Sequence, residues 1–492
     1  MDSRKSQRGG YMYKTVIGLE IHAQLSTKTK AFCSCRADVF ELEPNTVICP
    51  VCTGQPGALP VLNEKVVEYA VKAALALNCK INLRSTFDRK NYFYPDLPKG
   101  YQITQYFTPI AENGFLGFKF DGDEKRVRIR RIHIEEDAGK MIHQDADSIS
   151  GASGSLVNLN RCGVPLIEIV TEPDISSPKE ARLFMELLRD TLRALDICSG
   201  DMEKGALRCD ANISIVDEER GLSSNRVEVK NINSFKFVEK ALEFERERII
   251  KALETGSDVN RETRTWNFAK RETISMRSKE EENDYRYFPE PDLPPLQLSD
   301  EYVERIKERL PELPQQRIER LIREYGIPEY DATVLGSNAR LSSFFEEVAK
   351  STGKPKEASN WIMTELLREI NRRGIPLEKM PIGPEHFKIL FELLEQEKIS
   401  VKIAKELFPL MIETGKLPDQ LVKERGMEQI NDEKLIEDIV LRAMESNPKA
   451  VKQYRDGKKG VMGYFVGAVM KETRGKANPA AVNEIVRRLL ES

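Results

Sequence analysis

The stretch YKTVIGLEIHAQLST, residues 13–27, decides how the first half of the chain folds. Its odd positions from Ile17 to Leu25 are all apolar, whereas its even positions include Glu20 and His22. Alternate residues of a β-strand share one face, so the pattern predicts a strand whose odd face belongs to the core. The other face then carries a carboxylate beside an imidazole. An ordinary half-exposed strand and a pair of metal ligands both fit this stretch alone.

Two later stretches repeat the alternation. In LRCDANISIV the odd residues are apolar, and Arg208 and Asp210 share the other face. In RVEVKN two valines alternate with polar residues, among them Glu228 and Lys230. Each stretch therefore predicts a strand that places a carboxylate and a cation on one side.

The stretch RVRIRRIHIEEDAGK, residues 126–140, alternates as well, but its phase changes at Arg130–Arg131. One extra residue in a strand is a β-bulge, which we therefore expect here. Beyond the change two isoleucines face the core, and His133, Glu135 and Asp137 are expected to face outward.

Four polar faces of this kind indicate a single lined cleft. A hard cation such as Mg²⁺ takes carboxylate oxygens and bridges the phosphates of a nucleotide. Arg208, Lys230 and Lys140 would neutralise the phosphoryl oxygens there. Solvated sheet faces with cross-strand salt bridges remain the alternative.

Four of the eight cysteines form two close pairs, CSC and CPVC, with 13 residues between them. Cys33, Cys35, Cys49 and Cys52 predict a closed, structural zinc site, with a redox pair or chance clustering as the alternative. The sequence shows no secretory leader, so we expect a reducing compartment inside the cell, the cytoplasm.

The composition indicates a multidomain protein. The chain has 492 residues, 32% of them charged, with a net charge of −3. Such a balance does not indicate bulk nucleic-acid binding, so any RNA contact has to come from local patches. One such patch is residues 449–476, where eight Lys/Arg stand against two acidic residues.

The pattern along the chain predicts an α+β protein of three units. Residues 1–12 are expected to be a disordered leader or a tag. A large mixed α/β domain over 13–295 ends in a proline-rich connector. All-helical periodicity then follows over 296–412, and a small basic helical tail over 413–492.

Aromatic residues gather in two similar segments. NYFYPDLPKG at 91–100 and YRYFPEPDLPP at 285–295 both pair aromatics with a Pro-Asp-Leu-Pro turn. Aromatic rings interleaved with lysines suit single-stranded RNA ends, although rings around prolines are also good packing material.

Eight ordered motifs carry a resemblance to a known family. They are VIGLEIHAQL, FCSC…CPVCTGQPGALPVLN, RKNYFYPDLPKGYQITQY, HIEEDAGK, RCGVPLIEIVTEPDI, LRCDANISI, EVKNINSFKFVEKALEFE and MRSKEEENDYRYFPEPDLPPL. They lie between residues 16 and 296. The chain, over nearly its whole length, resembles the B subunits of the tRNA-dependent amidotransferases.

The resemblance implies a cradle domain, a helical domain and a tail similar to a YqeY-type module. It implies that the chain uses ATP and Mg²⁺ to phosphorylate Glu on mischarged tRNA(Gln), or Asp on tRNA(Asn), before ammonia displaces the phosphate. Nothing in the sequence resembles the Ser–Ser–Lys apparatus of an amidase. Ammonia is therefore expected from an amidase A subunit, with a small C subunit holding the two together.

The resemblance also implies the site residues. The catalytic and magnesium-binding residues are expected to be Glu20, His22, Glu135, Asp210 and Glu228, with Glu136 as the alternative to Glu135. The expected nucleotide contacts are Lys99, Lys140, Arg208, Lys230 and Asn231.

Two rival functions remain compatible with parts of the sequence. A non-catalytic tRNA-binding scaffold would need no carboxylates where anionic RNA approaches. A stand-alone ATP-dependent carboxylate–amine ligase would need no basic helical tail.

Overall fold

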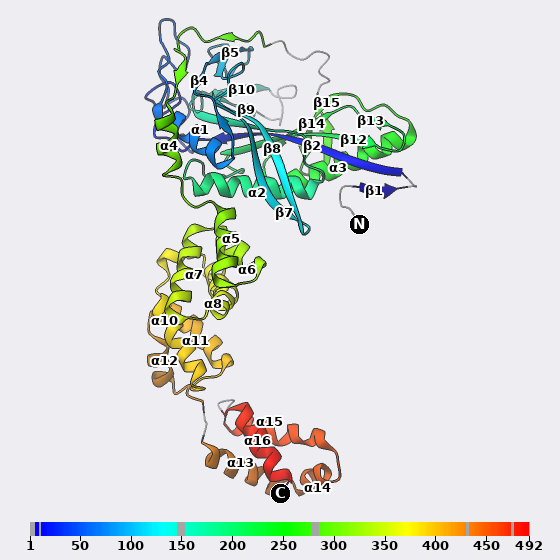
Figure 1. The fold of residues 1–492 in the computed structure, drawn as a ribbon, viewed down its shortest axis with the longest axis vertical. Coiled ribbons are helices and arrows are strands. Elements are labelled where there is room, and N and C mark those ends of the chain that lie inside the picture. The colour runs from blue at the N-terminus through cyan, green and yellow to red at the C-terminus, as the bar shows by residue number, and fades with distance from the viewer. Residues whose placement is uncertain are drawn as a thin grey trace. The chain divides into compact units, whose positions relative to one another are not determined.

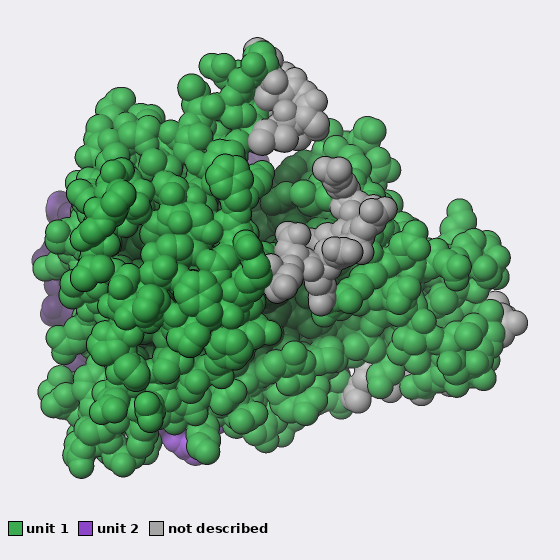
Figure 2. All heavy atoms as spheres, turned by 90° about the horizontal axis from the view of Figure 1, so that it is seen from above, with its two compact units in different colours: residues 1–315 green, residues 316–492 purple. Residues whose placement is uncertain are grey.

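The computed structural model divides the chain into two compact units, residues 1–315 and 316–492 (Figures 1 and 2). The described residues are 5–8, 11–144, 153–276, 285–429, 432–473 and 477–491. None of the helices in these ranges is both long and apolar enough to cross a membrane.

An eleven-stranded mixed sheet organises the first unit. Its strands are β1 (Lys5–Arg8), β2 (Tyr11–Gln24), β3 (Lys80–Ile81), β7 (Ala111–Phe120), β8 (Asp123–Glu136), β11 (Pro165–Thr171), β12 (Leu207–Asp217), β13 (Leu222–Ser223), β14 (Val227–Ile232), β15 (Glu262–Asn267) and β16 (Glu272–Ser275). They run in the order β16-β15-β14-β12-β2-β11-β8-β7-β3, with β1 beside β2 and β13 beside β12. The four strands predicted from alternation, β2, β8, β12 and β14, are all present.

Strand β2 lies near the middle of the sheet, and its odd face is core as predicted. Ile17, Leu19 and Ile21 are at most 1% exposed. The helices α1 (Glu64–Ala76), α2 (Pro178–Ala194) and α3 (Phe235–Thr255) contribute their apolar faces to the same hydrophobic cluster. The alternation in β2 therefore leaves Glu20 and His22 on the side away from this core.

The predicted bulge in β8 is confirmed. Against β11 the register passes from Val170↔Arg131 to Thr171↔Ile129, so Arg130 is the extra residue. The expectation that His133, Glu135 and Asp137 face outward is wrong, because all three side chains are buried. Burial is tolerated because each of them has a charged or polar partner.

Smaller sheets surround this arrangement. They are β17-β5-β6, made of β17 (Phe288–Pro289), β5 (Asp88–Asn91) and β6 (Tyr101–Thr104); β9 (Lys140–Gln144) with β10 (Gly154–Asn158); and β4 (Arg84–Ser85) with β18 (Leu296–Gln297). Figure 1 shows β5 and α2 on opposite sides of the large sheet. The last helix of the unit, α4 (Asp300–Lys307), packs on α1.

The expectation that residues 1–12 are a disordered leader or a tag stays a prediction. Residues 1–4 and 9–10 lie outside the described residues, but Lys5–Arg8 form β1, antiparallel to β2. The register Arg8↔Tyr11 leaves two residues, Gly9 and Gly10, between the strands.

The second unit is helical, as its periodicity predicts. Its helices are α5 (Pro314–Tyr325), α6 (Glu329–Gly336), α7 (Ala339–Thr352), α8 (Pro355–Trp361), α9 (Leu367–Arg373), α10 (Pro384–Glu395), α11 (Val401–Thr414), α12 (Pro418–Arg425), α13 (Glu433–Ser446), α14 (Pro448–Arg455), α15 (Met462–Glu472) and α16 (Pro479–Glu491). Two hydrophobic clusters lie in it, one from Leu321 to Val422 and one from Ile436 to Leu490. The predicted boundary at residue 412 stays a prediction, and residues 474–476 of the basic stretch lie outside the described residues.

Candidate active site

Three neighbouring strands bring acidic and imidazole side chains together on the side of the sheet away from the core. In β11, Glu168 is the register partner of His22 in β2 and of His133 in β8. Directly opposed residues on adjacent strands point to the same side of the sheet. Apolar residues alternate with these polar ones in β2 and β8, whereas Glu168 is the only charged residue of β11.

The side chains make direct contact. His22 Nε2 lies 3.2 Å from Glu135 Oε1 and 3.4 Å from Glu168 Oε2. His133 Nε2 lies 3.1 Å from Glu168 Oε2. Together with Glu20, these residues form what we call the carboxylate–imidazole cluster: Glu20, His22, His133, Glu135 and Glu168.

Charges within the cluster strongly shift the pKa values of its side chains. Burial and the neighbouring Glu168 carboxylate raise the pKa of Glu20 to about 7. Burial would also raise the pKa of Glu168, but His133 and His22 lower it well below its usual range. Burial lowers the pKa of His22, but Glu135 and Glu168 outweigh it and hold that pKa well above its usual range. A cation bound between Glu20 and Glu168 would be stabilising, because it would offset the repulsion between their carboxylates.

The donor set fits a divalent cation. Ligand atoms of Glu20, His22 and Glu168 all lie within 4.8 Å of one another, as do those of His133, Glu135 and Glu168. Carboxylate oxygens are the protein ligands that Mg²⁺ prefers, whereas an imidazole nitrogen suits transition metals better. Among the described residues, buried His133 Nδ1 has no hydrogen-bond partner, so the imidazole side of the cluster is not saturated.

Glu168 is the residue that sequence reasoning missed. The strand PLIEIVT is otherwise apolar or uncharged and almost wholly buried, and Glu168 is only 6% exposed. A lone carboxylate inside such a strand is a signal in itself, because a buried charge needs a partner. The alternation pattern does not predict Glu168 as a site residue, because the other residues on its face of the strand are not charged.

Asp210 and Glu228 lie beside the cluster on β12 and β14, but both form ion pairs with Lys230. Asp210 is the register partner of Glu20. Lys230 Nζ lies 2.7 Å from Asp210 Oδ2 and 3.1 Å from Glu228 Oε1. Glu228 Oε2 also accepts a hydrogen bond from Thr263 Oγ1 at 2.8 Å. In this arrangement an ammonium neutralises both carboxylates.

Arg208 is placed at the same part of the sheet. It is the register partner of His22, and its guanidinium donates to Asp137 Oδ2 at 2.6 Å. Its buried Nε has no hydrogen-bond partner in the part of the chain that the structure describes. Arg161 Nε lies 3.5 Å from the same Asp137 oxygen, so two guanidinium groups share one buried carboxylate.

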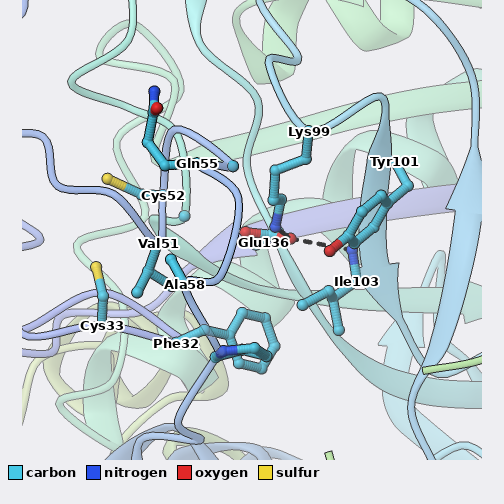
Figure 3. Close-up of a pocket in the computed structure, with 13 residues that line it drawn as sticks. Phe32, Cys33, Val51, Cys52, Gln55, Ala58, Lys99, Tyr101, Ile103 and Glu136 are labelled. Atoms are coloured by element: carbon cyan, nitrogen blue, oxygen red, sulfur yellow. Dashed lines mark hydrogen bonds and ion pairs between the residues drawn. The ribbon is translucent and has the colours of Figure 1, made fainter. Parts of the chain in front are cut away.

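Glu135 and Glu136 point to different surroundings. Glu136 makes an ion pair with Lys99, and its Oε1 accepts a hydrogen bond from the Ile103 backbone at 3.0 Å. Lys99 and Glu136 line a cavity of about 80 Å³ whose other walls include Phe32, Cys52 and Tyr101 (Figure 3). Of the two adjacent glutamates, Glu135 therefore belongs to the carboxylate–imidazole cluster, whereas Glu136 pairs with Lys99.

Two more expected nucleotide contacts lie outside the cluster. Lys140 is exposed on β9. Asn231 has a φ of 60°, in the left-handed region, and its side-chain amide donates to Thr265 Oγ1 at 3.2 Å. Neither side chain is part of the carboxylate–imidazole cluster.

The four predicted zinc ligands converge. The sulfur atoms of Cys33, Cys35, Cys49 and Cys52 all lie within 4.8 Å of one another. The backbone N–H of Cys49 also donates to Cys52 Sγ at 3.2 Å. Four converging thiols with a backbone donor to sulfur are the donor set that a structural zinc ion takes. The residues present therefore fit the ion.

Comparison with known proteins identifies relatives that cover 97% of the chain. Residues 15–304 match the family described as "GatB/GatE catalytic domain", and residues 343–490 match the "GatB domain". The B subunit of the aspartyl/glutamyl-tRNA(Asn/Gln) amidotransferase of Thermotoga maritima is 67% identical over 97% of this chain and 99% of its own length. The proteins of the same name from Thermosipho melanesiensis and Caldicellulosiruptor saccharolyticus are 58% and 51% identical, with the same coverage.

Proposed function

The chain belongs to the family of tRNA-dependent amidotransferase B subunits, and from that premise we propose that it phosphorylates the side-chain carboxylate of Glu or Asp carried by a mischarged tRNA. A carboxylate oxygen attacks the γ-phosphorus of ATP, and ADP leaves. Ammonia then attacks the acyl carbon of the mixed anhydride, inorganic phosphate leaves, and the loss of a proton gives Gln-tRNA(Gln) or Asn-tRNA(Asn).

The observation that carries the proposal is the cluster in which the half-buried Glu20 and His22 converge with the buried Glu168. A scaffold that only binds RNA would gain nothing from burying two carboxylates within reach of each other, because their repulsion is destabilising. A cation-assisted phosphoryl transfer requires such a group of oxygen ligands.

Each part of the cluster has a role in this proposal. Glu20, Glu168 and Glu135 would hold Mg²⁺, and His22 and His133 would orient the carboxylates. When bound, the ion would neutralise charge on the transferred phosphoryl group. Asp210 and Glu228 would join the site when Lys230 moves from them to the phosphates of ATP.

Positive side chains nearby would bind the nucleotide. Arg208 has an unpaired buried Nε beside His22, which makes it the strongest candidate. For Lys99, Lys140 and Asn231, a role in nucleotide binding rests on the resemblance alone. Among the described residues, none of the three contacts the cluster. The cysteine site would hold a structural Zn²⁺.

The proposed partners follow from the chemistry. The reaction needs ammonia, which a glutamine-hydrolysing A subunit would supply, and a small C subunit would complete a heterotrimer. The tRNA would be that for Gln, Asn or both. We place the reaction in the cytoplasm, where aminoacyl-tRNAs are made and used.

The test is phosphate release from γ-³²P-ATP by the assembled heterotrimer with Glu-tRNA(Gln) and Mg²⁺, with glutamine withheld. Release by the wild type that depends on tRNA, and its loss in Glu20→Gln with tRNA binding intact, is the expected result. Equal release by both proteins would contradict the proposal, because the Glu20 face would then be surface only.

A further inference from the structure

The two similar Pro-Asp-Leu-Pro segments, almost 200 positions apart in the sequence, lie side by side in the fold. Strand β17 pairs with β5 through Phe288↔Arg89, and β5 pairs with β6. The backbone N–H of Asn91 donates to the carbonyl of Tyr285 at 2.9 Å. One small sheet thereby gathers the aromatic residues of both segments.

Three rings of these segments form a continuous set with two rings that come just after β6, Tyr106 and Phe107. We call this set the aromatic wall: Tyr92, Tyr106, Phe107, Tyr285 and Tyr287. Tyr106 and Tyr287 are stacked, with centroids 3.9 Å apart and planes 10° apart. Tyr285 meets Tyr92 and Tyr287 edge to face, and Phe107 meets Tyr106 in the same way.

The outer part of the wall is open. Phe107 is 58% exposed and Tyr106 41%. Rings that served only to pack the small sheet would be covered, because burying an aromatic side chain is the main gain from having one. Large exposed aromatic side chains grouped together indicate a binding surface.

Two cations are built into the wall. Lys90 Nζ lies 4.8 Å from the centroid of Tyr285 and 6.0 Å from that of Tyr92. The Arg131 guanidinium lies 5.5 Å from the Tyr106 centroid and donates to the Tyr106 carbonyl at 3.2 Å. Positive charge among stacked rings complements a ligand that has both a flat base and a phosphate.

The wall is next to the carboxylate–imidazole cluster. The charge of Lys90 interacts with Glu135 and Glu168 as well as with Tyr285 and Tyr287. Arg131 is two residues from His133 on the same strand, β8. A ligand that lies on the rings is therefore beside the proposed phosphoryl-transfer site.

We propose that the aromatic wall is the subsite for the unpaired 3′-terminal base of the tRNA. This inference rests on the proposed function, in which the amino acid esterified to the terminal ribose reaches the cluster. Only that ribose then separates the amino acid from the base, so the base has to lie close to the cluster. An open ring surface suits the unstacked end of an RNA strand, whereas a small molecule such as ATP is usually enclosed by its site.

The experiment uses the heterotrimer and uncharged tRNA in which 2-aminopurine replaces the 3′-terminal adenosine. Stacking quenches the fluorescence of this base. We expect the wild type to quench it, and Phe107→Ala and Tyr106→Ala to weaken binding of the labelled end by about tenfold, since a base–aromatic stack contributes about that much or more. Phe107→Tyr keeps a ring and should keep the quenching.

Phe40→Ala is the matched control, since Phe40 is 52% exposed but lies outside the wall. Equal quenching by the wild type, Tyr106→Ala and Phe107→Ala would overturn the proposal. A tenfold rise in KM for ATP with unchanged quenching would also overturn it, because the rings would then hold the adenine of the nucleotide. The fluorescence measurement does not depend on phosphate transfer. If the wild type released no phosphate but still quenched the base in a way that depends on the rings, only the proposed function would be contradicted.

Discussion

Lys30 Nζ lies 3.6 Å from Cys52 Sγ, and the Lys30 residue has no exposed surface. The same ammonium donates to the Val47 carbonyl at 2.8 Å. Burying an unpaired ammonium costs several kcal/mol, so the cation needs a negative neighbour. Hydrogen bonding with Cys33 and the backbone of Cys49, together with the charge of Lys30, lowers the pKa of Cys52 to about 4, although burial acts the other way. Lys30 is thus an internal counter-ion of the thiol cluster.

Replacing Lys30 by methionine should weaken zinc binding. Loss of an outer-shell partner usually costs about 10- to 100-fold in metal affinity. Competition with a chromogenic chelator on the full chain measures the change. Lys28→Met is the matched control, because Lys28 is exposed two residues away. Equal zinc affinity of the wild type and Lys30→Met would show that the buried ammonium does not support the site.

Replacing Glu168 by glutamine should abolish most phosphate release. The change removes one of the proposed oxygen ligands and leaves the shape of the side chain, so we expect a loss of about 100-fold, equivalent to about 2.7 kcal/mol of barrier. The apparent affinity for Mg²⁺ in the same assay should fall by about 10-fold or more.

Glu172→Gln separates this effect from a general effect of losing a carboxylate. Glu172 is four positions further on and makes an ion pair with Arg130, 2.9 Å apart, outside the cluster. It should retain the activity and the Mg²⁺ dependence of the wild type. A Glu168→Gln protein that is folded and fully active would remove Glu168 from the proposed site.

The alternation of residues was enough to predict four of the strands that carry the site, β2, β8, β12 and β14, but not β11 with Glu168. Apolar residues on the odd positions of β2 and β12 require the even positions to share a face, whatever the partners are. The phase change in β8 likewise predicts the bulge at Arg130, since one extra residue reverses every side chain that follows.

Pairing between strands could not be predicted in the same way. His22 contacts Glu168 because β11 lies between β2 and β8, and this order depends on contacts between residues far apart in sequence. Nor does alternation show that Lys230 lies between Asp210 and Glu228. Buried polar faces such as that of His133 look the same in sequence as exposed ones, because the partners that compensate them come from other strands.

Replacing Lys230 by methionine should increase the affinity for Mg²⁺ in the absence of nucleotide. Without the ammonium, the carboxylates of Asp210 and Glu228 lose the cation that contacts both of them, and a divalent cation can take its place. A tenfold gain in cation affinity would add about 1.4 kcal/mol to the stabilisation by Mg²⁺. Thermal unfolding with and without Mg²⁺ measures it.

Lys140→Met serves as the comparison for this experiment. Lys140 is an exposed lysine on β9 outside the cluster, so its removal should leave the Mg²⁺-dependent stabilisation unchanged. If Mg²⁺ stabilises Lys230→Met no more than the wild type, Lys230 does not occupy a cation position.

In the second unit, Glu346 should make stability depend on pH. Its carboxylate accepts hydrogen bonds from Arg320 at 2.8 and 3.1 Å and from Tyr325 at 3.3 Å, which ties α7 to α5. Burial would raise the pKa of Glu346, but these bonds, chiefly those of Arg320, lower it below the usual 4.5. A depressed pKa in the folded state means that the stabilisation is complete above the unfolded value of about 4.5 and is lost as the pH falls through the folded value.

The difference between the wild type and Glu346→Gln isolates this one carboxylate from all others that titrate. Near neutral pH we expect the variant to be less stable by about 1–2 kcal/mol, because the guanidinium loses its charged acceptor. Below pH 4.5 the difference should shrink as Glu346 of the wild type takes up a proton. Urea unfolding of the full chain, followed across this range, measures it. Glu347→Gln, at the exposed neighbouring position, should show a small difference that does not vary with pH. A pH-independent difference for Glu346→Gln would mean that the contact with Arg320 stabilises the unit through packing and not through charge.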